Sequence, residues 1–362
     1  PGRLPPGFHD HVGEGVAVYA EADAVQVLGA CAGRTVLADP FTANAWTQRA
    51  LREAGATLKA GDDPALLPKA CKNDTEVAGA REAHRRDGLA VVRFLAWLDA
   101  EVAAGRLHDE ARLAEQLLAF RREQPLFRQP SFDTISAAGA NAAMCHYNHR
   151  DNAPAALEPD SVYLVDSGGQ YLDGTTDITR TVAIGDPGDA VRRLFTRVLK
   201  GHIALDTAVF PPGTTGTHLD ALARQFLWQA GYDYDHGTGH GVGAFLSVHE
   251  GPQRIAKAWN AAALAPGMIV SNEPGYYRDD AFGMRCENLV VVKAIDNPAF
   301  EQPMLGFEAL TLAPFDLRLV VPELLTAGER AWLDRYHARV RETLTPDLDA
   351  ATAAWLAEAT RP

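Results

Sequence analysis

Two aspartates, Asp166 and Asp177, lie within the stretch 165–181, which reads VDSGGQYLDGTTDITRT. The β-branched and aromatic run at 161–165 predicts one strand, and the apolar-polar alternation at 178–184 predicts a second. Glycine and Asp-Gly residues between the two runs predict a chain reversal. The stretch therefore predicts an antiparallel hairpin with one carboxylate on each arm.

The position of the reversal decides whether these two carboxylates can meet. A two-residue turn at Asp173-Gly174 would leave the aspartates on the order of 13 Å apart at the strand rise, too far to share one ion. For the two to face each other, the chain must reverse between Tyr171 and Leu172. We therefore expect a bulge or a wider loop at this turn.

A second pair of carboxylates has the same arrangement. Glu273 and Glu287 flank a polar turn, and their midpoint falls at Asp280. Glu287 leads into the apolar run 289–292, where an anion is costly to bury unless a cation compensates it. This segment predicts a second hairpin with one carboxylate on each arm.

A histidine pair, His236 and His240, lies in the glycine-rich segment DHGTGHGVG, which predicts a loop passing close to another part of the chain. One imidazole together with the two hairpins makes a five-ligand set with a formal charge of about −4, which two divalent cations would neutralise. Oxygen and imidazole ligands without cysteine suit Mn²⁺ first, with Co²⁺ or Zn²⁺ as alternatives. The predicted metal ligands are Asp166, Asp177, His240, Glu273 and Glu287.

The segments DSGGQYLDGTTDITRT, HGTGHGVG, VHEGP, NEPGYY and GMRCEN, in this order, resemble the aminopeptidase P family of metallopeptidases, family M24B, which has the pita-bread fold. The resemblance implies the same five metal ligands, two metal ions, and cleavage of the bond between an N-terminal residue and a following proline. It also implies substrate-binding and proton-transferring roles for His146, His236 and His249, with Glu273 moving a proton and Arg285 supporting the site. The segment FEALTL at 307–312 is similar to the three-domain cytosolic-type members.

Helices and strands are predicted in blocks rather than in a strict alternation, which favours an α+β fold. We expect part of a small creatinase-like α/β domain at 1–70, the pita-bread catalytic domain at 71–317 and a helical extension at 318–362. In the first domain, strands are expected at 16–19, 25–28, 35–37 and 57–59 around a helix at 45–54. Because the chain begins without Met, we expect a processed or truncated product. The resemblance implies that two creatinase-like domains precede the catalytic domain, of which only part of the second is present.

The C-terminal extension carries Trp332, Tyr336 and Trp355 on predicted helices, the first of which starts at a capping box formed by Thr326 and Glu329. Large apolar groups are unusual at a chain end, where disorder is the default. We therefore expect this extension to mediate self-association into a homodimer. The alternative is that the aromatic residues pack on their own catalytic domain.

Composition excludes several kinds of partner. A formal charge of −13 argues against nucleic acid or an anionic membrane, and no run approaches 18 apolar residues. The four cysteines are widely spaced and form no CxxC pair, which predicts free thiols. These features predict a soluble, cytoplasmic protein.

Three other kinds of protein share parts of this pattern. Methionine aminopeptidases space the two glutamates more widely than the 14 positions found here. Prolidases, which cleave Xaa-Pro dipeptides, share the whole motif set, and only GTTDITRT and the C-terminal resemblance favour aminopeptidase P. Inactive pita-bread binding modules lose metal ligands, whereas all five are present. For the proline ring we expect a pocket formed by the aromatic and histidine side chains around His146-Tyr147, Phe245 and His249.

Overall fold

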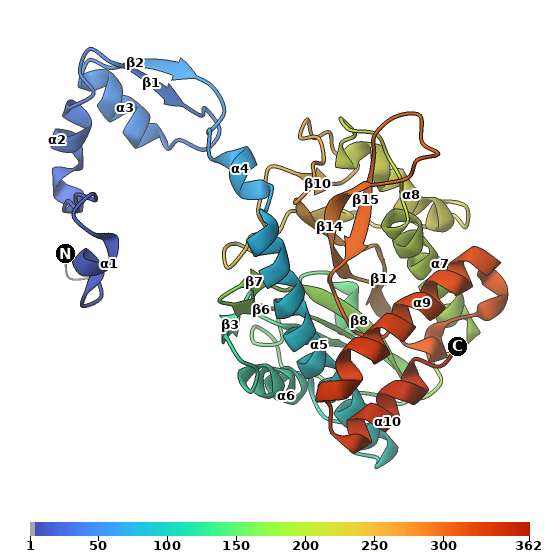
Figure 1. Cartoon of the computed structure of the whole chain (residues 1–362). Coiled ribbons are helices and arrows are strands. Elements are labelled where there is room, and N and C mark those ends of the chain that lie inside the picture. Colours follow the sequence, from blue (N-terminus) through green and yellow to red (C-terminus); the bar gives the residue numbers. More distant parts are fainter. Residues whose placement is uncertain (1–3) are drawn as a thin grey trace. The chain divides into compact units, whose positions relative to one another are not determined.

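The computed structural model describes residues 4–362 and divides the chain into two compact units, one up to Leu67 and one from Pro68 onward (Figure 1). The three-domain division expected from the sequence stays a prediction. Within the described residues, no helix is both long enough and apolar enough to cross a membrane.

The first unit contains a two-stranded parallel sheet, β1 (Thr35–Ala38) with β2 (Thr57–Ala60), joined through α3 (Ala45–Glu53). The helix begins at Asn44, whose side chain accepts a hydrogen bond from the Thr47 amide. Two expected strands are wrong. Residues 16–19 form no strand, and residues 25–28 belong to α2 (Ala24–Gly29), because β1 and β2 pair only with each other and offer these segments no partner among the described residues.

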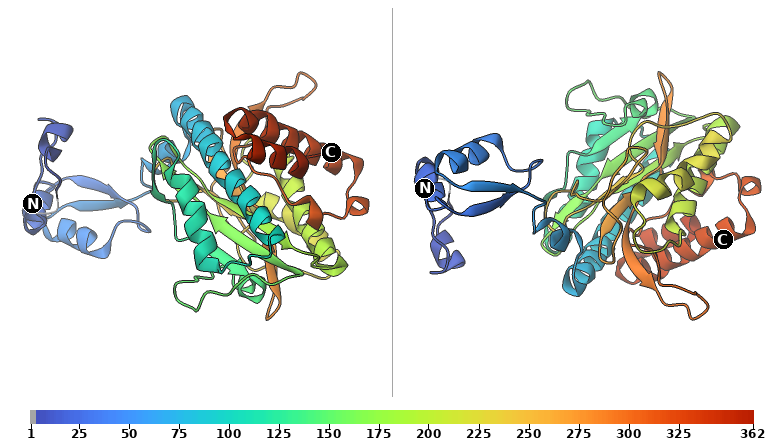
Figure 2. Two further views of the ribbon diagram at one scale, coloured as in Figure 1. Left: turned by 90° about the horizontal axis from the view of Figure 1, so that it is seen from below. Right: turned by 90° about the horizontal axis from the view of Figure 1, so that it is seen from above.

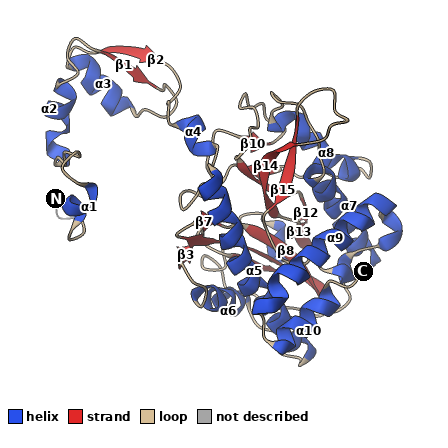
Figure 3. Ribbon diagram, in the orientation of Figure 1, coloured by secondary structure: helices blue, strands red, loops and turns tan. Residues whose placement is uncertain are grey.

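In the second unit, strands lie in the middle and helices cover them on the outside (Figures 2 and 3). Two long helices precede the first group of strands. They are α5 (Asp74–Ala103), which starts at the capping box of Asn73 and Glu76, and α6 (Glu110–Arg122). One three-stranded sheet consists of β4 (Ile135–Ala138), β5 (Ser161–Ser167) and β8 (Ile178–Ile184), and another of β3 (Phe127–Pro130), β6 (Gly169–Tyr171) and β7 (Gly174–Thr175).

A second pair of helices precedes the remaining strands. They are α7 (Asp189–Asp206) and α8 (Gly216–Trp228). A third sheet combines β11 (Ile269–Asn272), β14 (Asn288–Ile295) and β15 (Met304–Ala309), and β12 (Gly275–Arg278) pairs with β13 (Phe282–Arg285). The short strands β9 (Gly239–His240) and β10 (Arg254–Ile255) form a further pair. This mixture confirms the expected α+β class.

The first carboxylate hairpin turns at a different place from the one expected. Asp166 pairs with Thr179 and Tyr171 pairs with Gly174, so one register runs through the whole hairpin and the turn is Leu172-Asp173. The expected bulge with a reversal between Tyr171 and Leu172 is therefore wrong. Asp177 lies two residues from Thr179, so the two aspartates share a face as diagonal rather than direct neighbours.

The second carboxylate hairpin is confirmed. Asn272 pairs with Asn288 in β11 and β14, and Tyr277 pairs with Gly283 in β12 and β13. Both pairs are centred on Asp280, as the sequence predicted. The register therefore places Glu273 opposite Glu287.

The C-terminal segment forms α9 (Ala327–Leu344) and α10 (Ala350–Ala359), and the capping box of Thr326 and Glu329 is present. Trp332 and Tyr336 are buried in the main core of the same unit. The indole N–H of Trp355 donates to Asp99 Oδ2 at 2.9 Å. Trp332 and Tyr336 therefore pack on their own unit, as the alternative expected, and self-association of this chain stays a prediction.

Stability should depend on pH through the buried His337, whose Nε2 accepts the Phe315 amide hydrogen at 3.1 Å. Burial, with Arg180 and Arg341 nearby, lowers the pKa of His337 to about 3. Between pH 6.5 and 3 the unfolded chain binds a proton here and the folded chain does not, so acid favours unfolding by about 1.4 kcal/mol per pH unit. His337→Gln keeps an acceptor but cannot titrate. On lowering the pH from 7 to 5, the free energy of unfolding measured in urea should fall by about 2 kcal/mol less in the variant than in the wild type. An equal fall in both proteins would contradict this role.

Candidate metal centre

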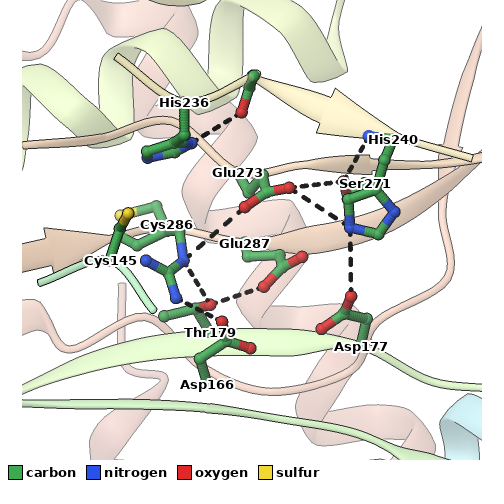
Figure 4. A network of polar contacts seen from close by, with 12 residues as sticks. Cys145, Asp166, Asp177, Thr179, His236, His240, Ser271, Glu273, Cys286 and Glu287 are labelled. Atoms are coloured by element: carbon green, nitrogen blue, oxygen red, sulfur yellow. Dashed lines mark hydrogen bonds and ion pairs between the residues drawn. The ribbon is translucent and has the colours of Figure 1, made fainter. Parts of the chain in front are cut away.

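Carboxylates from both hairpins converge on one imidazole (Figure 4). Asp177, His240 and Glu287 each offer a ligand atom, and these atoms lie within 4.8 Å of one another. His240 Nε2 is 3.5 Å from Asp177 Oδ2 and 3.5 Å from Glu273 Oε1. Four of the five predicted ligands thus meet around one point.

The glycine-rich loop fixes the orientation of His240. Its backbone N–H donates to Ser271 Oγ at 2.9 Å, and its Nδ1 lies 3.1 Å from the Gly241 carbonyl. If Nδ1 carries the proton, Nε2 is free to bind a metal. A Cβ at Gly239 would lie 1.9 Å from the Ser271 carbonyl oxygen, so only glycine permits this close approach.

The fifth predicted ligand, Asp166, is turned toward Arg285. Its Oδ2 forms an ion pair with the Arg285 guanidinium, whereas its buried Oδ1 has no hydrogen-bond partner among the described residues. A buried carboxylate oxygen without a partner is costly, and a cation would satisfy it. Asp166 therefore fits a ligand role although it does not lie among the four converging side chains.

The charges of this cluster are poorly compensated by the protein alone. Burial, with Asp166 and Glu273 nearby, raises the pKa of Asp177 to about 7. Burial, with Asp177, Glu273 and Asp166 nearby, also raises the pKa of Glu287 well above its usual value. Burial opposes ionisation of Glu273, but His240, His236 and Arg285 keep its pKa below the usual value. Divalent cations are the partners that such a group of carboxylates fits.

Neighbouring side chains hold the carboxylates in place. Thr179 Oγ1 donates to Glu287 Oε2 at 2.6 Å, and Ser271 Oγ donates to Glu273 Oε1 at 3.0 Å. Arg285 Nε lies 3.8 Å from Glu273 Oε2. Thr179 and Ser271 were not among the predicted site residues, although Thr179 lies within the first quoted motif and Ser271 directly precedes NEPGYY.

The cluster opens into a cavity of about 660 Å³, and His146, His236 and His249 all line it. His236 Nε2 lies 2.8 Å from the Tyr277 hydroxyl, which accepts a hydrogen bond from Arg285 at 2.7 Å. Burial lowers the pKa of His236 and His249, with His240 adding to the effect on His249. All five residues expected to act on the substrate therefore border one cavity with the metal cluster.

The expected proline pocket is partly wrong. Tyr147 is buried with its hydroxyl on Glu110, and Phe245 is exposed, so neither lines the cavity. The apolar lining comes instead from side chains that include Phe132, Ile135 and Val248. The proline interpretation relied on Tyr147 and Phe245. Phe132 and Ile135 come instead from another segment, and only Val248 is next to one of the histidines, His249.

A buried ion pair holds the loop that carries His249. Lys72 Nζ donates to Glu250 Oε1 at 3.2 Å and also contacts the Val242 carbonyl. The Glu250 amide in turn donates to the Gly241 carbonyl at 2.7 Å. Lys72 is 170 or more residues from these partners, so no sequence spacing indicated the contact.

Comparison with known proteins places these features in a family. A protein of Laccaria bicolor named "Probable Xaa-Pro aminopeptidase P" is 52% identical over 294 residues, covering 80% of this chain and 46% of that protein. A protein of the same name from Arthroderma otae is 42% identical over 361 residues, covering 98% of this chain and 57% of that protein. The chain thus spans about half the length of the curated relatives it matches.

Solved structures of Xaa-Pro peptidases also resemble this chain. The X-prolyl aminopeptidase of Caenorhabditis elegans, described as a cytosolic enzyme with a di-nuclear active site, matches with a TM-score of 0.82 at 33% identity, over 91% of this chain and 62% of that one. The Xaa-Pro dipeptidase of Bacillus anthracis matches with a TM-score of 0.64 at 26% identity, over 78% of this chain and 74% of that one. These likenesses confirm the expected pita-bread fold.

The model of metallopeptidase family M24 matches residues 78–294, and the model of the C-terminal region of peptidase M24 matches residues 303–362. The first of these matches includes both carboxylate hairpins and the histidine loop. The chain belongs to metallopeptidase family M24.

Proposed function

We propose that this chain carries the catalytic part of an Xaa-Pro aminopeptidase, which hydrolyses the bond between an N-terminal residue and a following proline. The observation that supports it most is the convergence of Asp177, His240, Glu273 and Glu287 at a cavity lined by three further histidines. The names of the related proteins agree with this activity.

The proposed ligands of two divalent ions are Asp166, Asp177, His240, Glu273 and Glu287. Bound ions of this kind lower the pKa of water and polarise a carbonyl oxygen. Because four of the five ligands are carboxylates, we propose Mn²⁺, with Zn²⁺ or Co²⁺ as alternatives.

In this proposal the chain's own residues orient the substrate and move its protons. Glu273, whose pKa Arg285 helps to keep below the usual value and whose other oxygen Ser271 fixes, accepts the proton that the attacking water gives up and passes it to the leaving proline nitrogen. His146 and His249, on the cavity wall, donate to the negative charge that develops on the carbonyl oxygen. The carboxylate cluster attracts the substrate's α-ammonium group.

Specificity for proline follows from the chemistry of the bond. The Xaa-Pro amide has no N–H, and the ring fixes φ, so a site that needs a donor at this nitrogen rejects proline. We expect kcat/KM with Mn²⁺ to be highest for Ala-Pro-Ala, lower for Ala-Pro and lowest for Ala-Ala-Ala. A preference for the dipeptide would instead indicate a prolidase, and equal cleavage of Ala-Ala-Ala would exclude proline specificity.

A cytoplasmic homodimer stays a prediction for this chain. The description of the Caenorhabditis elegans enzyme as cytosolic supports the location. Sedimentation of the purified chain tests the oligomeric state, and a monomer at micromolar concentration would contradict it.

A further inference from the structure

The segment 139–155 presents His146 to the cavity but contains little regular structure of its own, only the short 3₁₀ helix η2 (Gly139–Ala143). The His146 ring is exposed, and its one side-chain hydrogen-bond partner among the described residues is Cys145, whose Sγ lies 3.8 Å from Nδ1. The position of this ring therefore depends on how the rest of the segment is held.

Both ends of the segment are attached to one buried carboxylate, Glu110. Its Oε1 accepts the Ala138 amide at 2.7 Å and Asn141 Nδ2 at 2.9 Å. Its Oε2 accepts the Tyr147 hydroxyl at 2.7 Å and the Ala155 amide at 2.9 Å. One side chain thus connects the start, the middle and the end of the segment.

These contacts account for the full acceptor capacity of the carboxylate, which is 0% exposed. No Lys, Arg or His forms an ion pair with Glu110 among residues 4–362. Four donors and the N-terminal end of α6 are therefore what stabilise this buried charge.

The Glu110 side chain is not needed to cap α6. The preceding residue, Asp109, already caps the helix by accepting the Arg112 amide at 2.8 Å. The Glu110 amide donates to the Ala155 carbonyl at 3.0 Å, reciprocal to the bond from the Ala155 amide. The side chain of Glu110 therefore serves the segment 139–155 rather than its own helix.

We infer that Glu110 is a positioning residue for His146, acting through the segment 139–155. The inference rests on the proposed function, in which His146 contacts the substrate. A misplacement of about 1 Å of a substrate-binding group can cost of order 10²-fold in rate, so the effect should be large for a residue that never reaches the substrate.

The test is a double-mutant cycle. Glu110→Gln places an NH₂ group against two donors and should lower kcat/KM for Ala-Pro-Ala by about 10- to 100-fold, with metal content unchanged. In the His146→Ala background the same change should cost less than about 2-fold, because the positioned group is gone. An equal loss in both backgrounds, or full activity of Glu110→Gln, overturns the inference.

A pair of less disruptive substitutions tests the inference if Glu110→Gln does not fold. Tyr147→Phe removes one bond to Glu110, whereas Tyr171→Phe removes an equivalent buried bond, at 2.9 Å, to Asp87. We expect Tyr147→Phe to lower kcat/KM only when His146 is present, and Tyr171→Phe to act equally in both backgrounds. Identical behaviour of the two variants overturns the inference.

Hydrogen exchange separates this inference from the proposed function. Tyr147→Phe should speed amide exchange in 139–155 and leave exchange in β11 and β14 unchanged, whether or not the chain cleaves Ala-Pro-Ala. If the chain is inactive with every metal, the proposed function fails, and the exchange result still decides whether Glu110 holds the segment. Unchanged exchange in 139–155 overturns the inference.

Discussion

Glu287→Gln is expected to remove at least one of the two proposed ions and to lower kcat/KM for Ala-Pro-Ala by much more than 100-fold. Loss of a residue that only orients a metal ligand already costs about 10- to 100-fold. Glu287 would bind the ions directly, and glutamine keeps its size and its contact with Thr179 but removes the charge. Metal analysis of the purified chain, combined with steady-state kinetics, measures both effects.

The same variant should change stability in opposite directions with and without metal. In the metal-free chain Glu287 is buried beside Asp177 and Glu273, which raise its pKa together with burial. Removing the charge should therefore raise the Tm of the metal-free variant above that of the metal-free wild type. With metal present the order should reverse, because only the wild type gains the full binding energy.

Glu308→Gln is the matched control. This carboxylate lies on β15 and pairs with Arg81 at 2.8 Å, outside the carboxylate cluster. The control should keep two ions and full activity. Retention of two tightly bound ions by Glu287→Gln would contradict the ligand assignment.

The two hairpins differ in how well the sequence predicted them, and the difference has a physical reason. In the second hairpin, the turn residues and the midpoint between Glu273 and Glu287 both place the turn at Asp280, so the register was predicted correctly. At the first hairpin the prediction required Asp166 to face Asp177 directly. A diagonal pair on one face is also close, and it permits the unbroken register and tight turn at Leu172-Asp173.

Local signals predicted the helix at 45–54 and the capping box at Thr326 well. They could not predict which distant groups hold the site. Glu110 follows an N-cap and reads as an ordinary residue of a helix's first turn, and only the folded chain brings it to Tyr147 and Ala155. The apolar wall of the cavity and the Lys72–Glu250 pair depend on similarly distant contacts.

Asp87→Ala is expected to lower the free energy of unfolding by about 3–5 kcal/mol, because it leaves Arg121 buried without its partner. Asp87 accepts two hydrogen bonds from Arg121, at 2.8 and 3.0 Å, and one from the Tyr171 hydroxyl at 2.9 Å. Burial opposes ionisation of Asp87, but Arg121 and Tyr171 hold its pKa below the usual value. Urea unfolding of the metal-free chain at pH 7 measures the loss.

The double variant Asp87→Leu/Arg121→Met separates the cost of an unpaired charge from the value of the pair. Replacing a whole buried pair by apolar groups of similar volume is often close to neutral, so most of the lost stability should return. Arg121 on α6 is 2% exposed and pairs with Asp87 on α5, so its guanidinium cannot reach solvent unless one of the helices moves. A double variant as unstable as Asp87→Ala would show instead that the hydrogen bonds of the pair, rather than the stranded charge, hold the two helices together.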